Sequence, residues 1–378
     1  MPANPSPTVL GDIEIRNACT RWLHGHRPVR SMRESLLALA DLPEAAAPPD
    51  VYGEGATLQA LEADLATLLG KPAARFFHKG VAAQLAVLRV WCSRSPGAVA
   101  MHPQGHIAID EAQAYRELMG LNAALVGDTD AAFTTAQLAA LPERPGVVVV
   151  ELPLRRGGYR LPAWDELVAL SAWCRAQGVP LHFDGARLWE AAAHYNRPLA
   201  EIAALADSVY VSFYKGLGGL SGSMLLGDAA LMAAVEPWQT RLAGSLYTVY
   251  PFVLSAREGL RQQLPQMPRY RARAQALAAA LAAEPGWRVA PEPPQVNAFQ
   301  LHLPVDPVPL RAALLAVAVA EGFWLGARAV AGAQPGTAMV EVVIGDAADA
   351  WQDAEAVEAW RHAVALARAS THANAIAP

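Results

Sequence analysis

The chain has 378 residues, of which 53% are hydrophobic and 17% are charged. A chain of this length predicts about two domains, and this composition supports a large buried core and excludes general disorder. The 30 Lys and Arg residues against 35 Asp and Glu residues give a formal net charge of −5. Such mild acidity argues against nucleic acid as the main partner, because phosphate binding needs a concentrated basic surface.

Cysteine usage and the absence of long apolar runs predict a cytoplasmic setting. Cys19, Cys92 and Cys174 are too few and too scattered for a disulfide framework, which favours a reducing compartment. The N-terminus lacks the basic start and apolar stretch of a signal peptide. No apolar run approaches the ~20 residues that span a membrane. We therefore expect a soluble, cytoplasmic protein, most simply an enzyme.

The first two thirds of the chain alternate between strands and helices. Residues 1–50 are expected to form an arm with one short helix over 32–42, and an apolar periodicity predicts the next helix over 56–69. Continuous apolar strands alternating with helices imply a mainly parallel sheet covered on both faces, hence an α/β fold. The expected strands are 74–77, 98–101, 146–152, 179–183, 208–212 and 224–226, and the helices are 82–91, 112–119, 164–177 and 187–194.

The pattern changes after residue 255, where a smaller α/β lobe is expected. The predicted organisation is an arm over residues 1–50, a large domain over 51–255 and a small C-terminal α/β domain over 256–378. The Ala-rich tail from residue 369 is expected to fray. The elements expected here are helices at 257–264, 270–283, 309–321 and 354–368 and strands at 297–303 and 339–344.

The densest group of candidate catalytic residues follows two predicted strands. VPLHF leads into Asp184-Gly-Ala-Arg187, and SVYVSFY leads into Lys215-Gly-Leu-Gly-Gly. Ligands of open parallel sheets bind beyond the carboxyl ends of the strands, so these three side chains are expected to face one cleft. Taken singly, an Asp or a Lys at a strand end more often forms a surface salt bridge.

The glycines after Lys215 favour a chemical role for this lysine. Gly216, Gly218 and Gly219 leave little bulk around it and permit close approach of a ligand. A lysine in such a pocket can lose its proton and condense with an aldehyde. Pyridoxal phosphate chemistry needs this lysine and also a carboxylate at the pyridine nitrogen, for which Asp184 is the natural candidate.

The segments FDGARLWEAA and ADSVYVSFYKGLGG resemble the threonine aldolase and β-eliminating lyase family of fold type I pyridoxal-phosphate enzymes. Residues 50–77, the Gly105-His106-Ile107 segment with Glu111, and the Gly157-Gly158 turn extend the resemblance, which covers residues 12–260 well. It implies a fold type I, transferase-like α/β fold, with 51–255 as the cofactor-binding domain. It also implies pyridoxal 5′-phosphate as cofactor and an amino acid as the small-molecule substrate.

The resemblance also implies roles for individual residues. Lys215 would bind the cofactor aldehyde covalently, and Asp184 would pair with the pyridine nitrogen. His106 would stack on the ring; without the resemblance it would be an ordinary loop histidine. Arg187 would contact the ring oxygen or the substrate carboxylate. The scattered histidines lack the further ligands of a metal site, so no metal is expected.

Three segments near the expected cofactor differ from the family pattern. The phosphate loop reads Lys79-Gly80-Val81, where the family usually has Ser-Gly-Thr. Tyr214 precedes the lysine in place of a Ser, and Leu154 stands where a His usually handles the substrate hydroxyl. The sequence therefore predicts a divergent member in which the parts that define threonine as substrate are replaced.

Two further departures concern the neighbouring subunit and the substrate carboxylate. A family Arg that reaches the phosphate across a subunit interface falls at Tyr247, with Arg241 nearby, and the family implies a homodimer or homotetramer. The carboxylate-binding Arg falls at Glu341, which leaves Arg187 or Arg328 to bind the substrate carboxylate.

Three functions remain open at this point. The expected reaction is cleavage of the Cα–Cβ bond of a β-hydroxy-α-amino acid to glycine and an aldehyde, with His106 acting through water or Tyr214 as candidate bases. β-Elimination or racemisation needs no base for a β-hydroxyl, and the replacement of the family His by Leu154 modestly favours this alternative. A non-catalytic pyridoxal-phosphate binder is the third, although joint retention of the four catalytic candidates argues against it.

Overall fold

The computed structural model describes residues 7–28, 31–128 and 131–376, and the chain divides into two units. The larger unit spans residues 35–267, and the smaller unit combines residues 1–34 with 268–378. The expected arm over residues 1–50 is thus divided between the two units. The boundary expected after residue 255 lies after residue 267 instead.

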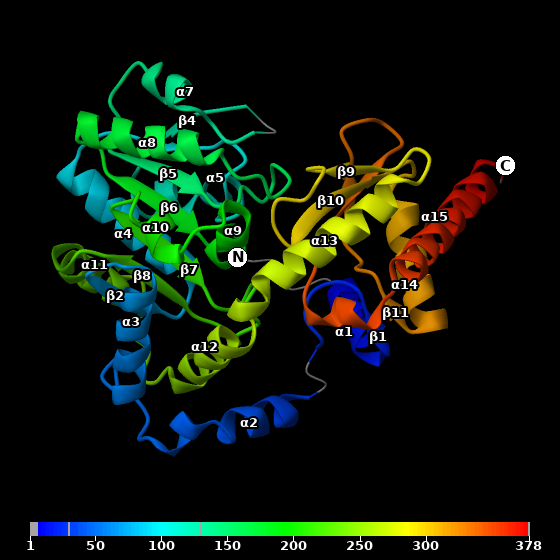
Figure 1. Ribbon diagram of the computed structural model, residues 1–378, viewed down its shortest axis with the longest axis horizontal. Helices are drawn as coiled ribbons and strands as arrows, with labels where there is room; N and C mark the ends of the chain where they lie inside the picture. Colours follow the sequence, from blue (N-terminus) through cyan, green and yellow to red (C-terminus); the bar gives the residue numbers. More distant parts are fainter. Residues whose placement is uncertain (1–6, 29–30, 129–130, 377–378) are drawn as a thin grey trace. The chain divides into compact units, whose positions relative to one another are not determined.

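A seven-stranded sheet forms the centre of the larger unit (Figure 1). Its order is β2-β8-β7-β6-β5-β3-β4; the strands from β7 to β4 pair in parallel, and β8 is antiparallel to both of its neighbours. The mainly parallel sheet predicted from sequence is therefore confirmed. The strands are β2 (Ala73–Phe77), β3 (Val99–Met101), β4 (Ala123–Leu125), β5 (Val147–Glu151), β6 (Leu181–Gly185), β7 (Ser208–Ser212) and β8 (Ser223–Gly227).

The central strands are continuous apolar runs because they are buried on both faces. The four valines of β5 and every residue of β6 and β7 are buried. Helix α4 packs on β2, β5, β7 and β8, and α11 packs on α4 and β2. The helices are α2 (Met32–Ala40), α3 (Ala56–Leu68), α4 (Gly80–Arg94), α5 (His106–Ile109), α6 (Ala114–Glu117), α7 (Thr135–Ala139), α8 (Trp164–Gln177), α9 (Leu188–Tyr195), α10 (Leu199–Ala203), α11 (Ala229–Arg241) and α12 (Tyr250–Gln262).

The helix predicted over residues 112–119 is shorter in the structure, where α6 covers only Ala114–Glu117. Ala112 and Gln113 have φ angles of 49° and 56°, in the left-handed region, which interrupts a helix. A second short helix, α5, which the sequence did not predict, precedes this segment and covers His106–Ile109. The break places Glu111 in a turn beside His106 instead of on a helix face.

The smaller unit contains an antiparallel sheet of order β12-β13-β10-β9 and a parallel pair, β1-β11. Cys19 and Trp22, which the sequence placed in the arm, are buried with Trp324 in a cluster of this unit. The last helix continues to Ile376, beyond the expected end at 368. The elements are α1 (Pro7–Ala18), β1 (Arg21–Trp22), α13 (Met267–Ala282), β9 (Arg288–Ala290), β10 (Ala298–Leu303), α14 (Pro307–Glu321), β11 (Phe323–Trp324), β12 (Ala329–Ala331), β13 (Ala338–Val343) and α15 (Asp353–Ile376).

In the ranges that the structure describes, no helix combines the length and the apolar character needed to cross a membrane.

Candidate active site

A cavity of about 80 Å³ lies in the larger unit, where β5 and β6 end. It brings together the four residues that the sequence singled out as catalytic, although they come from three separate segments of the chain. The cavity is lined by His106, Glu151, Leu152, Pro153, Arg155, Asp184, Ala186, Arg187 and Lys215.

Asp184 presents a buried carboxylate to this cavity. Asp184 is 3% exposed, and its Oδ1 accepts a hydrogen bond from the Ala186 N–H at 3.2 Å. Its strand neighbours in register are Glu151 on β5 and Tyr210 on β7. No ion pair joins Asp184 to a basic side chain among the described residues. A buried carboxylate without a protein cation is suited to pair with a cationic group of a ligand.

Lys215 follows β7 and lies in a turn that only glycine permits. A Cβ at Gly216 would overlap the Glu190 carboxylate, and a Cβ at Gly219 would come within 3.0 Å of the Phe213 carbonyl oxygen. Gly218 has a φ of 69°, which also favours glycine. The glycines singled out in the sequence therefore let the chain turn tightly and direct Lys215 to the cavity.

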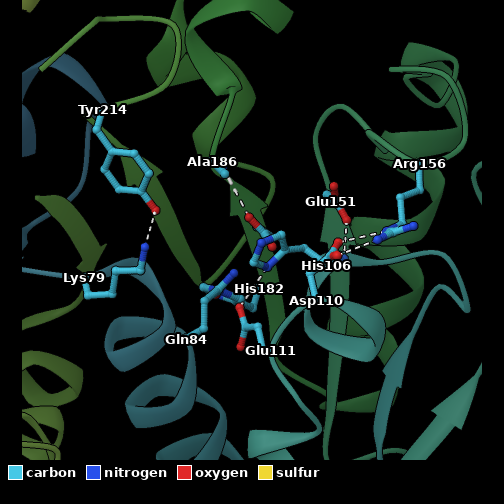
Figure 2. Close-up of polar contacts among 11 residues, drawn as sticks. Lys79, Gln84, His106, Asp110, Glu111, Glu151, Arg156, His182, Ala186 and Tyr214 are labelled. Carbon is cyan, nitrogen blue, oxygen red and sulfur yellow. Dashed lines mark hydrogen bonds and ion pairs between the residues drawn. The ribbon is translucent and has the colours of Figure 1, made fainter. Parts of the chain in front are cut away.

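His106 is held at both its backbone and its ring. Its N–H donates to Glu151 Oε2 at 2.8 Å, and its Nδ1 lies 2.9 Å from Oε1 of Glu111, whose side chain is 1% exposed (Figure 2). The hydrogen bond to Glu111 raises the pKa of His106, against the effect of burial and with help from the charge of Asp184. The carboxylate as partner of Nδ1 fixes the orientation of the ring.

Arg187 is positioned by an aromatic ring and a buried acid. Its guanidinium carbon lies 5.4 Å from the centroid of the Tyr159 ring, and its Nη1 lies 3.7 Å from Oε1 of Glu190, which is 1% exposed. Cation–π contact and partial burial keep the planar guanidinium in place. The planar guanidinium is thus available at the cavity to bind a carboxylate or a ring oxygen.

The Lys79-Gly80-Val81 segment begins α4 and does not line the cavity. Lys79 Nζ lies 3.5 Å from the Tyr214 hydroxyl and 4.9 Å from the centroid of its ring (Figure 2). A Cβ at Gly80 would overlap the Tyr210 hydroxyl, so this position also requires glycine. The first amides of a 15-residue helix, next to a lysine, suit an anion such as phosphate.

Arg241 and Tyr247 do not line the cavity either. Arg241 ends α11, and its guanidinium carbon lies 4.6 Å from the centroid of the Trp238 ring. Tyr247 is 64% exposed and contacts the ring of Tyr52 with the centroids 5.3 Å apart. Tyr247 is therefore accessible on the surface of its unit and is not part of a buried core turn.

Arg328 and Glu341 belong to the smaller unit. Arg328 precedes β12, and Glu341 lies in β13 with Gln300 of β10 as its strand neighbour.

Sequence reasoning missed Glu151 as a cavity residue and Glu190 as the partner of Arg187. Glu151 directly follows four valines at the end of a parallel strand, the same signal that identified Asp184 after LHF. Leu154, where a His was expected from the resemblance, is 2% exposed and packs on Gly157. Its side chain does not line the cavity, so it supplies no polar group there.

The family described as beta-eliminating lyase matches residues 27–303. The chain belongs to this family. A provisionally assigned L-allo-threonine aldolase from Listeria monocytogenes is 32% identical, with a TM-score of 0.87 over 93% of this chain and 98% of that one. Its similarity extends across both units and supports the fold type I architecture predicted from sequence.

Two curated relatives are similar over shorter stretches. Aldolase vrtJ from Penicillium aethiopicum is 36% identical over 191 residues, which is 48% of each chain. The low-specificity L-threonine aldolase 1 of Arabidopsis thaliana is 26% identical over 70% of this chain and 75% of that protein.

Membership of this family implies pyridoxal phosphate as cofactor, and the residues present fit that group. Lys215 offers an amine for the aldehyde, and Asp184 offers the ring nitrogen a buried carboxylate that forms no ion pair with the residues that the structure describes. The amides that begin α4 suit the phosphate.

Proposed function

We propose that this β-eliminating lyase family member cleaves the Cα–Cβ bond of a β-hydroxy-α-amino acid and releases glycine and an aldehyde. One observation carries the proposal: Lys215, Asp184, His106 and Arg187 line a single cavity. The names of the relatives support it, because an aldolase and a threonine aldolase are among them.

Each of these side chains has a distinct task in the proposed reaction. Pyridoxal phosphate, when bound, supplies an electron sink for the pair released at Cα. Asp184 keeps the pyridine nitrogen protonated, Lys215 binds the cofactor through its amine and moves a proton at Cα, and His106 covers the ring. Arg187 binds the ring oxygen or the substrate carboxylate, and Lys79, Gly80 and Val81 bind the phosphate through the start of α4.

β-Elimination is the second candidate, and one observation favours it. Leu154 packs on Gly157 away from the cavity, so the His expected there to accept the β-hydroxyl proton has no counterpart. Elimination from a β-substituted alanine needs only an α-proton base, which Lys215 supplies.

Product analysis separates the two reactions. Purified protein is incubated with β-hydroxy amino acids and, in parallel, with β-substituted alanines. We expect glycine and the matching aldehyde from the first set. Pyruvate and ammonia from the second set, with no glycine from the first, would replace the aldolase assignment by the lyase one.

We propose a homodimer or homotetramer as the functional unit, with the segment around Tyr247 at the subunit interface. Tyr247 is 64% exposed, and the Asp50 carboxylate fixes this loop by accepting the Val249 N–H at 2.9 Å. Tyr247→Ala and Arg241→Ala are expected to weaken phosphate binding. Each should raise the cofactor concentration at half-saturation by about tenfold, which corresponds to a loss of ~1.4 kcal/mol of binding free energy. Cofactor titration and sedimentation velocity check this, and a fully active monomer at assay concentration would contradict it.

We propose that Arg187 or Arg328 binds the substrate carboxylate in place of the Arg that falls at Glu341. Arg328→Ala is expected to raise the KM for any amino-acid substrate by about tenfold, a loss of ~1.4 kcal/mol, whereas Glu341→Gln changes it much less. Steady-state kinetics of both variants decide the point. A silent Arg328→Ala together with loss of binding in Glu341→Gln would instead indicate a substrate with a second cationic group.

The three cysteines are free and buried, which is compatible with the reducing cytoplasm that we propose as the location.

A further inference from the structure

Glu151 is an acid that lines the cavity and is not one of the four proposed catalytic residues. It ends β5, and its Cα partner on the adjacent parallel strand is Asp184. Both residues therefore occupy the carboxyl ends of neighbouring central strands, where ligands of parallel sheets bind. Figure 2 shows Glu151 beside His106.

Both carboxylate oxygens of Glu151 accept hydrogen bonds from backbone amides. Oε2 accepts the His106 N–H at 2.8 Å, and Oε1 accepts the Arg155 N–H at 3.2 Å. A carboxylate has about four lone-pair sites, so these two bonds leave room for a ligand hydroxyl. The two amides also fix the carboxylate in one orientation at the cavity wall, as acid–base catalysis requires.

The surroundings of Glu151 favour its protonation near neutrality. Burial is the main cause that raises the pKa of Glu151 to about 7, and the negative charge of Asp184 adds to it. The two amide hydrogen bonds and the charge of His106 act in the opposite direction. The other charged groups that line the cavity are Lys215, Arg187 and Arg155. A group with this pKa is populated in both forms at neutral pH, which suits a general acid or base.

The other candidates for the β-hydroxyl proton are less well placed. Leu154 has no titratable group, and Tyr214 contacts Lys79 and does not line the cavity. The Nδ1 of His106 is engaged with Glu111. Asp184 is needed at the pyridine nitrogen, so Glu151 is the carboxylate that remains.

We propose that Glu151 is the catalytic residue that accepts the proton of the substrate β-hydroxyl. This inference rests on the proposed Cα–Cβ cleavage. The O–H electron pair becomes the second C–O bond of the aldehyde as the Cα–Cβ bond breaks, and the Cα–Cβ pair remains with Cα. One proton from water is added at Cα and the proton on Glu151 is released to water, so the amino acid yields only glycine and aldehyde.

Glu151→Gln tests this assignment, because glutamine keeps the size of the side chain and one of its two accepting oxygens but cannot accept the proton. We expect the holoenzyme variant to keep the visible cofactor band and to lose about 10²–10⁴-fold in the rate of Cα–Cβ cleavage. Exchange of the glycine α-proton in D₂O needs no β-hydroxyl base, so its rate should match that of the wild type. Glu151→Asp, which keeps a carboxylate, should recover part of the cleavage.

Asp110→Asn is the matched control for a purely structural role of Glu151. Asp110 forms an ion pair with Arg156, with its Oδ2 2.8 Å from Nε (Figure 2). This pair joins the end of α5 to the segment after β5, the two segments that Glu151 also joins, but neither residue lines the cavity. Asp110→Asn should keep the wild-type rate of Cα–Cβ cleavage. A loss of rate equal to that of Glu151→Gln would show that only the connection between the two segments matters.

A difference infrared spectrum adds a readout that is independent of turnover. The holoenzyme should show a protonated carboxyl band that titrates near pH 7 and is missing in Glu151→Gln. Cleavage by wild-type protein should fall below that pH, because the protonated carboxyl cannot accept the hydroxyl proton.

Normal cleavage by Glu151→Gln, or a loss of glycine exchange as large as the loss of cleavage, would overturn the proposal. Wild-type protein that exchanges glycine but cleaves no β-hydroxy amino acid would instead reject the proposed function.

Discussion

Lys215→Ala is expected to abolish the visible absorption band of the bound cofactor and to reduce turnover by about 10⁴-fold or more. The lysine supplies both the covalent attachment and the proton transfer at Cα, so no other cavity residue replaces it. The chain has only three lysines, Lys71, Lys79 and Lys215. Borohydride reduction followed by peptide mass spectrometry therefore identifies the attachment site without ambiguity.

Lys71→Arg is the control for this experiment, because Lys71 donates to the Ala206 carbonyl outside the cavity and the substitution keeps the charge. Lys71→Arg should keep both the visible absorption band of the cofactor and the turnover rate. Retention of the band in Lys215→Ala, or a cofactor mass on the Lys79 peptide of wild-type protein, would refute the assignment of Lys215.

Asp184→Ala is expected to reduce turnover by about 10³-fold or more while the protein still folds. Its carboxylate is buried and forms no ion pair with a basic side chain in the described ranges, so its charge is available to the ring nitrogen. Without that charge the nitrogen loses its proton and the ring withdraws electrons poorly. The measurement is kcat, with the absorption spectrum and far-UV circular dichroism recorded on the same samples.

Asp110→Asn again provides the matched control, since it removes a nearby carboxylate that does not line the cavity. Near-normal turnover of Asp184→Ala would remove Asp184 from the proposed mechanism, whatever the result for Lys215.

The central sheet was predictable because its strands are buried on both faces. The apolar runs of β5, β6 and β7 predict buried strands of a parallel sheet. The carboxyl ends of β6 and β7 then place Asp184 and Lys215 at the same edge of that sheet. The juxtaposition of these residues therefore follows from local patterns and one rule of topology.

Other elements carry weaker local signals. Strand β4 has only three residues, none of them buried, and α11 contains Pro237, which disfavours a helix interior. β1 is two residues long and forms only by pairing with β11, about 300 residues away in sequence. Such elements exist because of tertiary contacts and not because of their own sequence.

The contacts inside the candidate site were the hardest to predict. His106 is 45 residues from Glu151 in sequence, and its other partner, Glu111, lies in the turn just before the left-handed residues Ala112 and Gln113. The pairing of Lys79 with Tyr214 spans 135 residues. Sequence patterns identify residue types at strand ends, but the partner of each polar atom is set by the loops between the strands.

The fate of a labelled Cα carbon tests the central claim most directly. A β-hydroxy-α-amino acid carrying ¹³C at Cα is incubated with the holoenzyme, with Lys215→Ala as the blank, and the products are followed by NMR. Cleavage of the Cα–Cβ bond predicts that the label appears in glycine and that unlabelled aldehyde forms in equal amount. Label appearing instead in a 2-oxo acid, with release of ammonia and no aldehyde, would contradict the proposed function.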